Sequence, residues 1–193
     1  LAKIQAGNTW ELSAVPYIPA VENVARHAAN LLGEQINGLM LGWTLGGYPS
    51  PNLEVVSTLA SSPNPNAPGA VANALLQVAT RRFGATAAPP VVDAWRAFSA
   101  AFSEFPYHGG LVYNAPMQYG PSNLLWASPT GYRATMGGFP YDDLDGWRQI
   151  FPPEVFIGQF LKIADGFDRA LATLRAALAA LPKPPSAAHR QAL

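Results

Sequence analysis

The sequence predicts an α/β protein, in which a strand–helix–strand unit in residues 1–50 is followed by a mainly helical extension in residues 51–193. Two short apolar segments, residues 2–6 and 37–43, are typical of strands. Between them, apolar residues keep helical spacing over residues 20–32, and Gly33 is a suitable stop. Two strands joined by one helix are expected to pair in parallel, with a right-handed crossover. The run at residues 39–41 has the apolar character of a strand buried on both faces.

The extension is predicted to contain four helices. Asn52 is a suitable cap for a short helix that ends near residue 60, and a second helix ends before Gly84. A third helix has an aromatic face, formed by Val91, Trp95, Phe98, Phe102 and Phe105. We expect this face to be core rather than a ligand site. The last helix spans residues 153–181, roughly 40 Å at 1.5 Å per residue.

No helical period survives between residues 106 and 152, a segment dense in aromatic side chains. Structureless stretches of this length are uncommon in compact domains and are usually either disordered or functional. Disordered segments contain few aromatics. We therefore interpret residues 106–152 as an ordered loop that binds a ligand or lines a site.

Composition excludes several functions. Charged residues make up only 12% of the chain, about half the usual share, which indicates a large buried fraction or a covered surface. The formal net charge of zero argues against nucleic acid as a partner. Without cysteine there is no disulfide, thiol nucleophile or zinc–thiolate site. No apolar run approaches the roughly 20 residues that span a bilayer, so we expect no membrane partner.

The chain opens at Leu1, almost inside a predicted strand. We therefore expect it to be part of a longer polypeptide and to pack on an upstream part of that polypeptide.

Aromatic and acidic residues follow both predicted strands. Trp10 and Glu11 come after the first strand, whereas Trp43 and then Tyr48 come after the second. Ligands usually bind at the carboxyl ends of parallel strands. A carboxylate beside an indole ring suits glycoside cleavage, in which the carboxyl group is acid, base or nucleophile and the ring stacks on sugar. Alternatively, Glu11 pairs with an arginine and Trp43 is a packing residue.

A second acidic run contains Asp142, Asp143 and Asp145, with Arg148 close behind. These carboxylates could bind sugar hydroxyls or a cation, although their spacing is not that of an EF-hand. A structural salt-bridge cluster with Arg133 and Arg148 explains the run equally well. The sequence has no phosphate-binding glycine loop, no Gly-x-Ser-x-Gly elbow and no metal-ligand cluster, so we expect neither a cofactor nor a metal.

Four segments resemble the C-terminal part of large bacterial glycoside hydrolase-like proteins: NTWELSAVPYIP, GWTLGGYPSPNLE, YNAPMQYGPSNLL and TGYRATMGGFPYDDLDGWR. The resemblance implies the C-terminal portion of a (β/α)8 barrel, whose last two strands end at Trp10-Glu11 and at Trp43. The chain departs from this pattern because it supplies only two strands. Six would lie upstream of Leu1, together with at least one catalytic carboxylate.

These patterns together predict a glycoside hydrolase fragment that cleaves a carbohydrate substrate with paired carboxylates. Glu11 is the predicted catalytic residue. The predicted substrate-binding residues are Trp10, Trp43, Tyr48, Asp142, Asp143 and Arg148. The alternative is a non-catalytic carbohydrate-binding or subunit-interaction domain.

Overall fold

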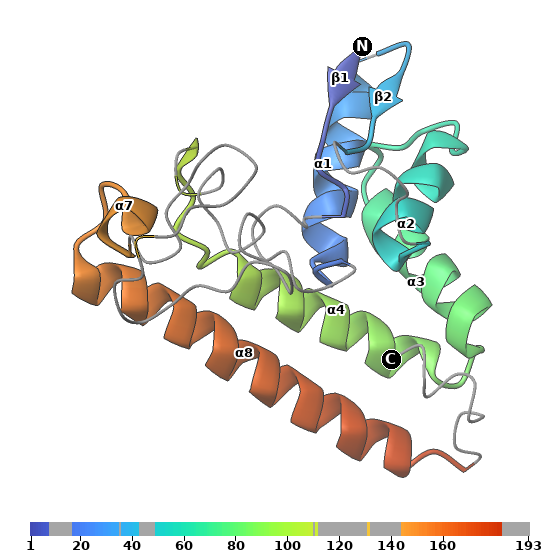
Figure 1. The fold of residues 1–193 in the computed structure, drawn as a ribbon. Helices are drawn as coiled ribbons and strands as arrows, with labels where there is room; N and C mark the ends of the chain where they lie inside the picture. The colour runs from blue at the N-terminus through green and yellow to red at the C-terminus, as the bar shows by residue number, and fades with distance from the viewer. Residues whose placement is uncertain are drawn as a thin grey trace.

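The computed structural model of the chain describes residues 1–7, 17–34, 36–42, 49–109, 111, 131 and 144–182, and it is mainly helical (Figure 1). The described helices and strands are β1 (Ala2–Lys3), α1 (Val21–Gly33), β2 (Leu39–Met40), α2 (Pro51–Ala60), α3 (Ala70–Phe83), α4 (Ala88–Phe102), α7 (Leu144–Arg148) and α8 (Pro153–Ala179). Helices α1, α3, α4 and α8 match the ranges expected from apolar spacing to within three residues.

Helix α1 is central to the core, because it packs against α2, α3 and α4. Its apolar face is built largely from small residues, which let the neighbouring helices approach closely. The fully buried apolar side chains of this core include Val21, Ala25, Ala28, Val55, Leu75, Val78 and Val91.

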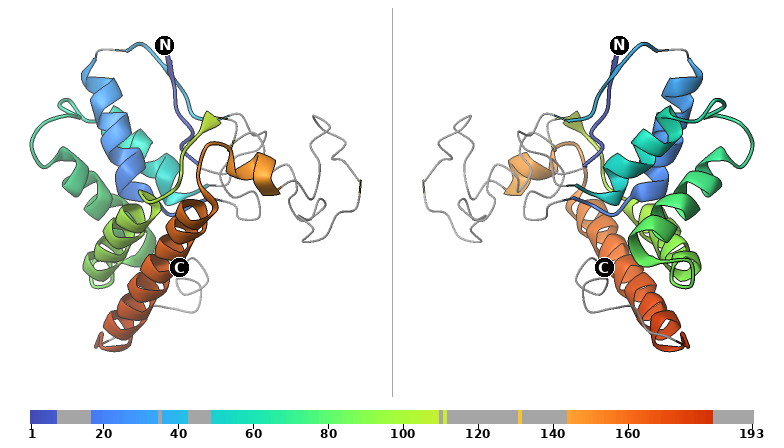
Figure 2. Two further views of the ribbon diagram at one scale, coloured as in Figure 1. Left: turned by 90° about the vertical axis from the view of Figure 1, so that its left-hand side faces the viewer. Right: turned by 90° about the vertical axis from the view of Figure 1, so that its right-hand side faces the viewer.

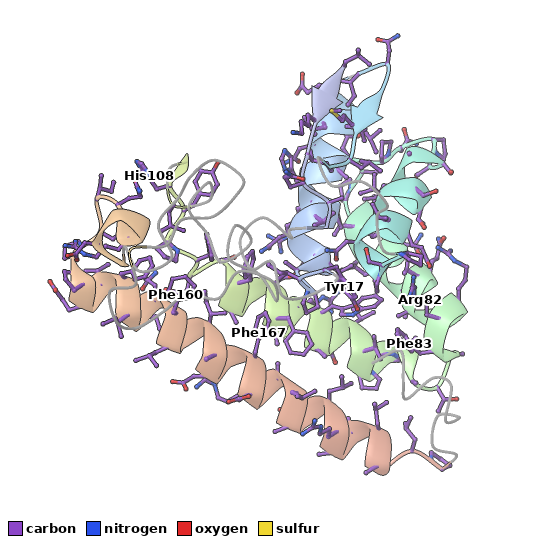
Figure 3. All side chains as sticks on the ribbon, in the orientation of Figure 1. Tyr17, Arg82, Phe83, His108, Phe160 and Phe167 are labelled. Carbon is purple, nitrogen blue, oxygen red and sulfur yellow. The ribbon has the colours of Figure 1, made fainter. Side chains whose placement is uncertain are left out.

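Helix α8 lies along α4, on the side away from α1–α3 (Figures 1 and 2). Phe167 meets Phe98 of α4 at a ring-centroid distance of 5.1 Å, and Phe160 meets Phe105 at 5.7 Å (Figure 3). Trp95, on the same face of α4, is buried against Phe83 of α3. The expectation that this aromatic face packs in the core is therefore confirmed for Val91, Trp95 and Phe98, whereas Phe102 and Phe105 are only half-buried and line a groove.

The predicted parallel pairing of the two N-terminal strands is also confirmed. Ala2 pairs with Leu39 and Lys3 with Met40. Backbone hydrogen bonds continue the pairing beyond the strands, since the Ile4 N–H donates to the Met40 carbonyl at 2.9 Å. Helix α1 connects the two strands.

The prediction of a (β/α)8 barrel portion is wrong. Within the described residues the only sheet is this two-stranded one, whereas a barrel needs a sheet that closes on itself. The run at residues 39–41 is not buried on both faces either, because Met40 is 54% exposed. The resemblance of four segments implied the barrel, whereas a parallel pair with one crossover helix occurs in many folds and does not by itself indicate one.

Two local features differ from expectation. Ser50, not Asn52, is the cap of α2: its side chain accepts a hydrogen bond from the Leu53 N–H, and Pro51 occupies the first helical position. Helix α7 falls inside residues 106–152, which the sequence predicted as a loop, and most of that segment lies outside the described residues.

The division of the chain at residue 50 stays a prediction. None of the described helices combines the length and apolar character that crossing a membrane requires.

Candidate functional site

Most of the predicted site residues lie outside the part of the chain that the structure describes. This applies to Trp10 and Glu11 in residues 8–16, to Trp43 and Tyr48 in residues 43–48, and to Asp142 and Asp143. Their roles stay predictions. The residues that flank the first two segments are described, and they define where each segment begins and ends.

The two segments begin at the same edge of the parallel pair. The Ala6 N–H donates to the Leu41 carbonyl at 3.0 Å, so Gly7 and Gly42 follow directly after hydrogen-bonded neighbours. Since the paired strands run in the same direction, both segments leave at the carboxyl end of the pair. Trp43 is the next residue after Gly42, and Trp10 is three residues after Gly7.

The first segment returns to the place where it began. The Ile18 N–H donates to the Gly7 carbonyl at 3.0 Å, which closes residues 8–17 at their base. This base is buried, because Ala6 is 0% exposed and Ile18 is 1% exposed. Residues 8–16 therefore depart from, and return to, a fixed point in the core.

Asn52 connects the first segment to the end of the second. Its Nδ2 donates to the Ile18 carbonyl at 2.8 Å, and its side chain is fully buried in the first turn of α2. Its Oδ1 is buried and accepts no hydrogen bond from any described residue. A buried polar group without a hydrogen bond carries a large desolvation cost. The bond to Ile18 removes that cost for the Nδ2 group of Asn52 and is therefore the stabilising contact of this side chain.

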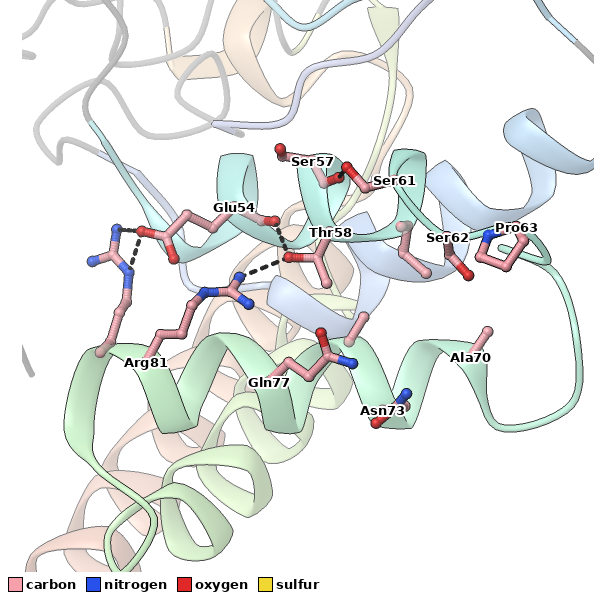
Figure 4. A pocket seen from close by; sticks show the side chains of 13 residues that line it. Glu54, Ser57, Thr58, Ser61, Ser62, Pro63, Ala70, Asn73, Gln77 and Arg81 are labelled. Atoms are coloured by element: carbon pink, nitrogen blue, oxygen red, sulfur yellow. Dashed lines mark hydrogen bonds and ion pairs between the residues drawn. The ribbon is translucent and has the colours of Figure 1, made fainter.

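Arg82 holds the end of the second segment. From the last turn of α3, its Nη2 donates to the carbonyl of Pro49 at 2.6 Å. The same guanidinium binds Glu54 of α2, with distances of 2.8 Å from Nε and 2.6 Å from Nη2 to Oε1 (Figure 4). Pro49 is the first described residue after residues 43–48. The Arg82 side chain is 20% exposed and that of Glu54 38% exposed, so these contacts lie at the surface and are reached by water.

A polar groove of about 870 Å³ lies between α2 and α3 (Figure 4). Glu54 and Arg82 line it, and Arg81 reaches across to donate to Thr58 Oγ1 at 2.8 Å. The other polar side chains along it are those of Ser57, Ser61, Ser62, Asn73 and Gln77. The groove therefore presents hydroxyl, amide and guanidinium groups, which suit hydrogen bonding to a polyhydroxylated ligand.

Arg148 is the one predicted binding residue that the structure describes. Its Nε donates to Asp145 Oδ1 at 2.9 Å, and its Nη1 donates to the Phe151 carbonyl at 2.8 Å. Both contacts lie within α7 and the turn that follows it. Arg148 therefore has a structural role in this turn, and its contact with sugar stays a prediction.

No pattern in the sequence points directly to the contacts that Asn52, Glu54 and Arg82 make. The sequence predicts Asn52 as a helix cap, because an asparagine before an apolar run is a typical cap. Glu54 and Arg82 are 28 positions apart, so no local spacing rule pairs them. The available signal was Pro49, which follows the glycine-rich run at residues 46–47 and marks the end of the loop.

Comparison with protein-family models, with curated proteins and with solved structures finds no significant match. Among the described residues, no group of three or more histidine, aspartate or glutamate side chains is placed to hold a metal ion.

Proposed function

We propose that this chain acts on carbohydrate as part of a glycoside hydrolase, with a site formed by residues 8–16 and 43–48. One observation carries the proposal. The hydrogen bond from Ala6 to Leu41 lies where both segments begin, and the hydrogen bond from Ile18 to Gly7 lies where the first segment ends. These points are all at one edge of the parallel pair. This supports the convergence of Trp10, Glu11, Trp43 and Tyr48 on a common site. A barrel is no part of the proposal.

Each residue has a role that its chemistry allows. Glu11 is the acid, base or nucleophile at the glycosidic bond, and the rings of Trp10, Trp43 and Tyr48 stack on the apolar faces of the sugar. Hydrolysis also requires a second carboxyl group, about 5 Å from the first in retaining enzymes and about 6.5–9.5 Å in inverting ones. We assign only the first of the two carboxylates. Asp142, Asp143 and Arg148 are proposed to contact sugar hydroxyls.

The test compares two variants of the full-length polypeptide on a panel of aryl glycosides and oligosaccharides. Glu11→Gln keeps the shape of the side chain but removes its ability to exchange a proton, so turnover should fall by about 10²- to 10⁴-fold while binding is retained. Trp43→Ala should weaken binding by about tenfold, since one stacked ring is lost. Unchanged turnover in Glu11→Gln would remove Glu11 from the mechanism.

The second candidate function is carbohydrate binding without catalysis. The polar groove between α2 and α3 favours it, because its hydroxyl, amide and guanidinium groups can bind sugar hydroxyls without an acid–base pair. The same panel separates the two functions. Saturable binding of an oligosaccharide with no turnover of any glycoside, measured in the full-length polypeptide with Glu11 intact, identifies a binding domain.

A further inference from the structure

We propose that the outer edge of β2 is an interaction surface, at which β2 pairs in antiparallel orientation with β2 of a second copy of this chain. The proposal does not depend on the proposed function. Strands β1 and β2 lie side by side at one end of the molecule (Figures 1 and 2). Among the described residues the sheet ends at β2, which therefore has β1 on one side and no strand on the other.

Leu39 carries the backbone groups that point away from β1. The Gly38 carbonyl accepts a hydrogen bond from the Ala2 N–H at 3.0 Å. The Met40 carbonyl likewise accepts one from the Ile4 N–H at 2.9 Å. Backbone groups of successive residues in a strand point to opposite sides, so the N–H and C=O of Leu39 point outward. Neither group forms a hydrogen bond with another described residue, so both can pair with a further strand.

The surroundings of this edge are apolar. A groove of about 330 Å³ lies beside β2, and no described residue that lines it is charged. Its apolar side chains are those of Leu32, Ile36, Leu39, Leu41, Leu53, Val56 and Ala60. Sheet edges that avoid pairing usually carry a lysine, a proline or an inward-pointing charge. The edge strand β1 has Lys3, whereas β2 consists of Leu39 and Met40, so β2 lacks these protecting features.

A second copy of β2 is a strand that complements this edge. In an antiparallel pair, two residues directly opposite each other can exchange both N–H···O bonds. A two-fold axis that places Leu39 opposite Leu39 of the second copy lets these two residues satisfy each other, which is the self-complementarity that such an axis requires. The pairing extends a two-stranded sheet, which is marginal alone, to four strands. The formal net charge of zero adds no overall repulsion between the copies.

The sequence contains no cysteine, so two single-cysteine variants provide a direct test. In Leu39→Cys the two thiols lie on directly opposite residues, with Cα atoms about 5.5 Å apart, which a disulfide can bridge. Met40→Cys is the matched control. Its side chain is the more exposed of the two, but residues 40 of the two copies are diagonal neighbours, more than about 7 Å apart. We expect mild oxidation to give about tenfold more cross-linked dimer in Leu39→Cys.

Sedimentation equilibrium measures the association itself. The average mass of the parent chain should rise from that of a monomer at about 10 µM toward that of a dimer at about 1 mM, since a contact of this size is weak. Leu39→Pro should stay monomeric, because it removes the donor of both proposed hydrogen bonds but none of those to β1. Leu39→Ala keeps the N–H and should still associate, although more weakly because apolar surface is lost. Circular dichroism shows whether each variant is folded.

A parent chain that stays monomeric at about 1 mM would overturn the proposal. So would a dimer that a folded Leu39→Pro leaves unchanged, or equal cross-linking of Leu39→Cys and Met40→Cys. The last two results would place the contact on another surface, such as the exposed side chains of Ile157 and Leu161 on α8. If Leu39→Pro does not fold, the cross-linking comparison decides alone.

Discussion

At the scale of single residues, Glu104 links the end of α4 to α8. Its Oε2 accepts hydrogen bonds from Gln159 Nε2 at 3.0 Å and from Lys162 Nζ at 3.1 Å. Gln159 also donates to the Glu104 backbone carbonyl at 2.9 Å. The hydrogen bonds from Lys162 and Gln159, with the positive charge of Lys162, lower the pKa of the Glu104 carboxyl below its usual value.

This direction predicts how stability depends on pH. A carboxyl group with a lower pKa in the folded state contributes stability that is fully present above the unfolded pKa, about 4.3. That contribution is lost as the pH falls through the folded pKa. We therefore expect Glu104→Gln to melt at a lower temperature than the parent at pH 7, with a difference that shrinks toward zero near pH 3. Thermal unfolding at both pH values measures it. A difference that does not change with pH would show that the charge of Glu104 contributes nothing.

At the scale of elements, the α4–α8 contact depends on a close approach at Gly166. A Cβ atom at this position would lie 2.5 Å from the Cβ of Ala101, a separation that real side chains do not show. Ala101 cannot rotate away, because its Cβ is fixed to the backbone of α4. Gly158, earlier on the same helix, has no described heavy atom within 4 Å of a Cβ added there.

The two glycines therefore make a matched pair with opposite predictions. Gly158→Ala should stabilise the protein by about 0.5–1 kcal/mol, because alanine loses less backbone entropy in a helix. Gly166→Ala should destabilise it by about 1–3 kcal/mol, because the extra methyl group separates α8 from α4. Urea denaturation of both variants provides the free energies of unfolding. Stabilisation of both by the same amount would mean that α8 does not pack this closely.

At the scale of the whole molecule, the sequence predicted local structure better than architecture. The apolar spacing of α1, α3, α4 and α8 located these helices, because each buries one face against its neighbours. The parallel pairing of β1 and β2 followed from the single helix between them. The barrel did not follow, since the number of strands in a sheet depends on contacts that local periodicity does not encode.

The candidate site shows the same limit. Trp10, Glu11 and Trp43 were identified because each follows a strand, and strand direction is a local property. Arg82 was missed because its contacts with Glu54 and Pro49 span 28 and 33 positions, and they arise only when α2 and α3 pack together. Candidate residues next to a strand can thus be read from the sequence, whereas contacts between distant helices cannot.

The packing of the helices predicts that stability is unevenly distributed over the molecule. Helix α1 packs against three other helices, whereas α8 packs chiefly against α4. In the first half of α8, buried apolar side chains are sparse: Phe156 and Ile163 are buried, but Ile157 and Leu161 are more than half exposed. A segment with few buried contacts opens at a lower free energy than the global unfolding reaction.

We therefore expect native-state hydrogen exchange in low denaturant to separate the two helices. Amides of α1 should exchange only through global unfolding, with a steep dependence on urea concentration that reflects the large surface exposed. Amides in residues 153–166 should exchange at a lower free energy and with a shallower dependence, since only the α8 contact opens. Identical free energies and slopes for the two helices would mean that α8 unfolds with the core as one cooperative unit. In that case the aromatic contacts of Phe160 and Phe167 would bind α8 as firmly as the alanine-rich face of α1 binds its neighbours.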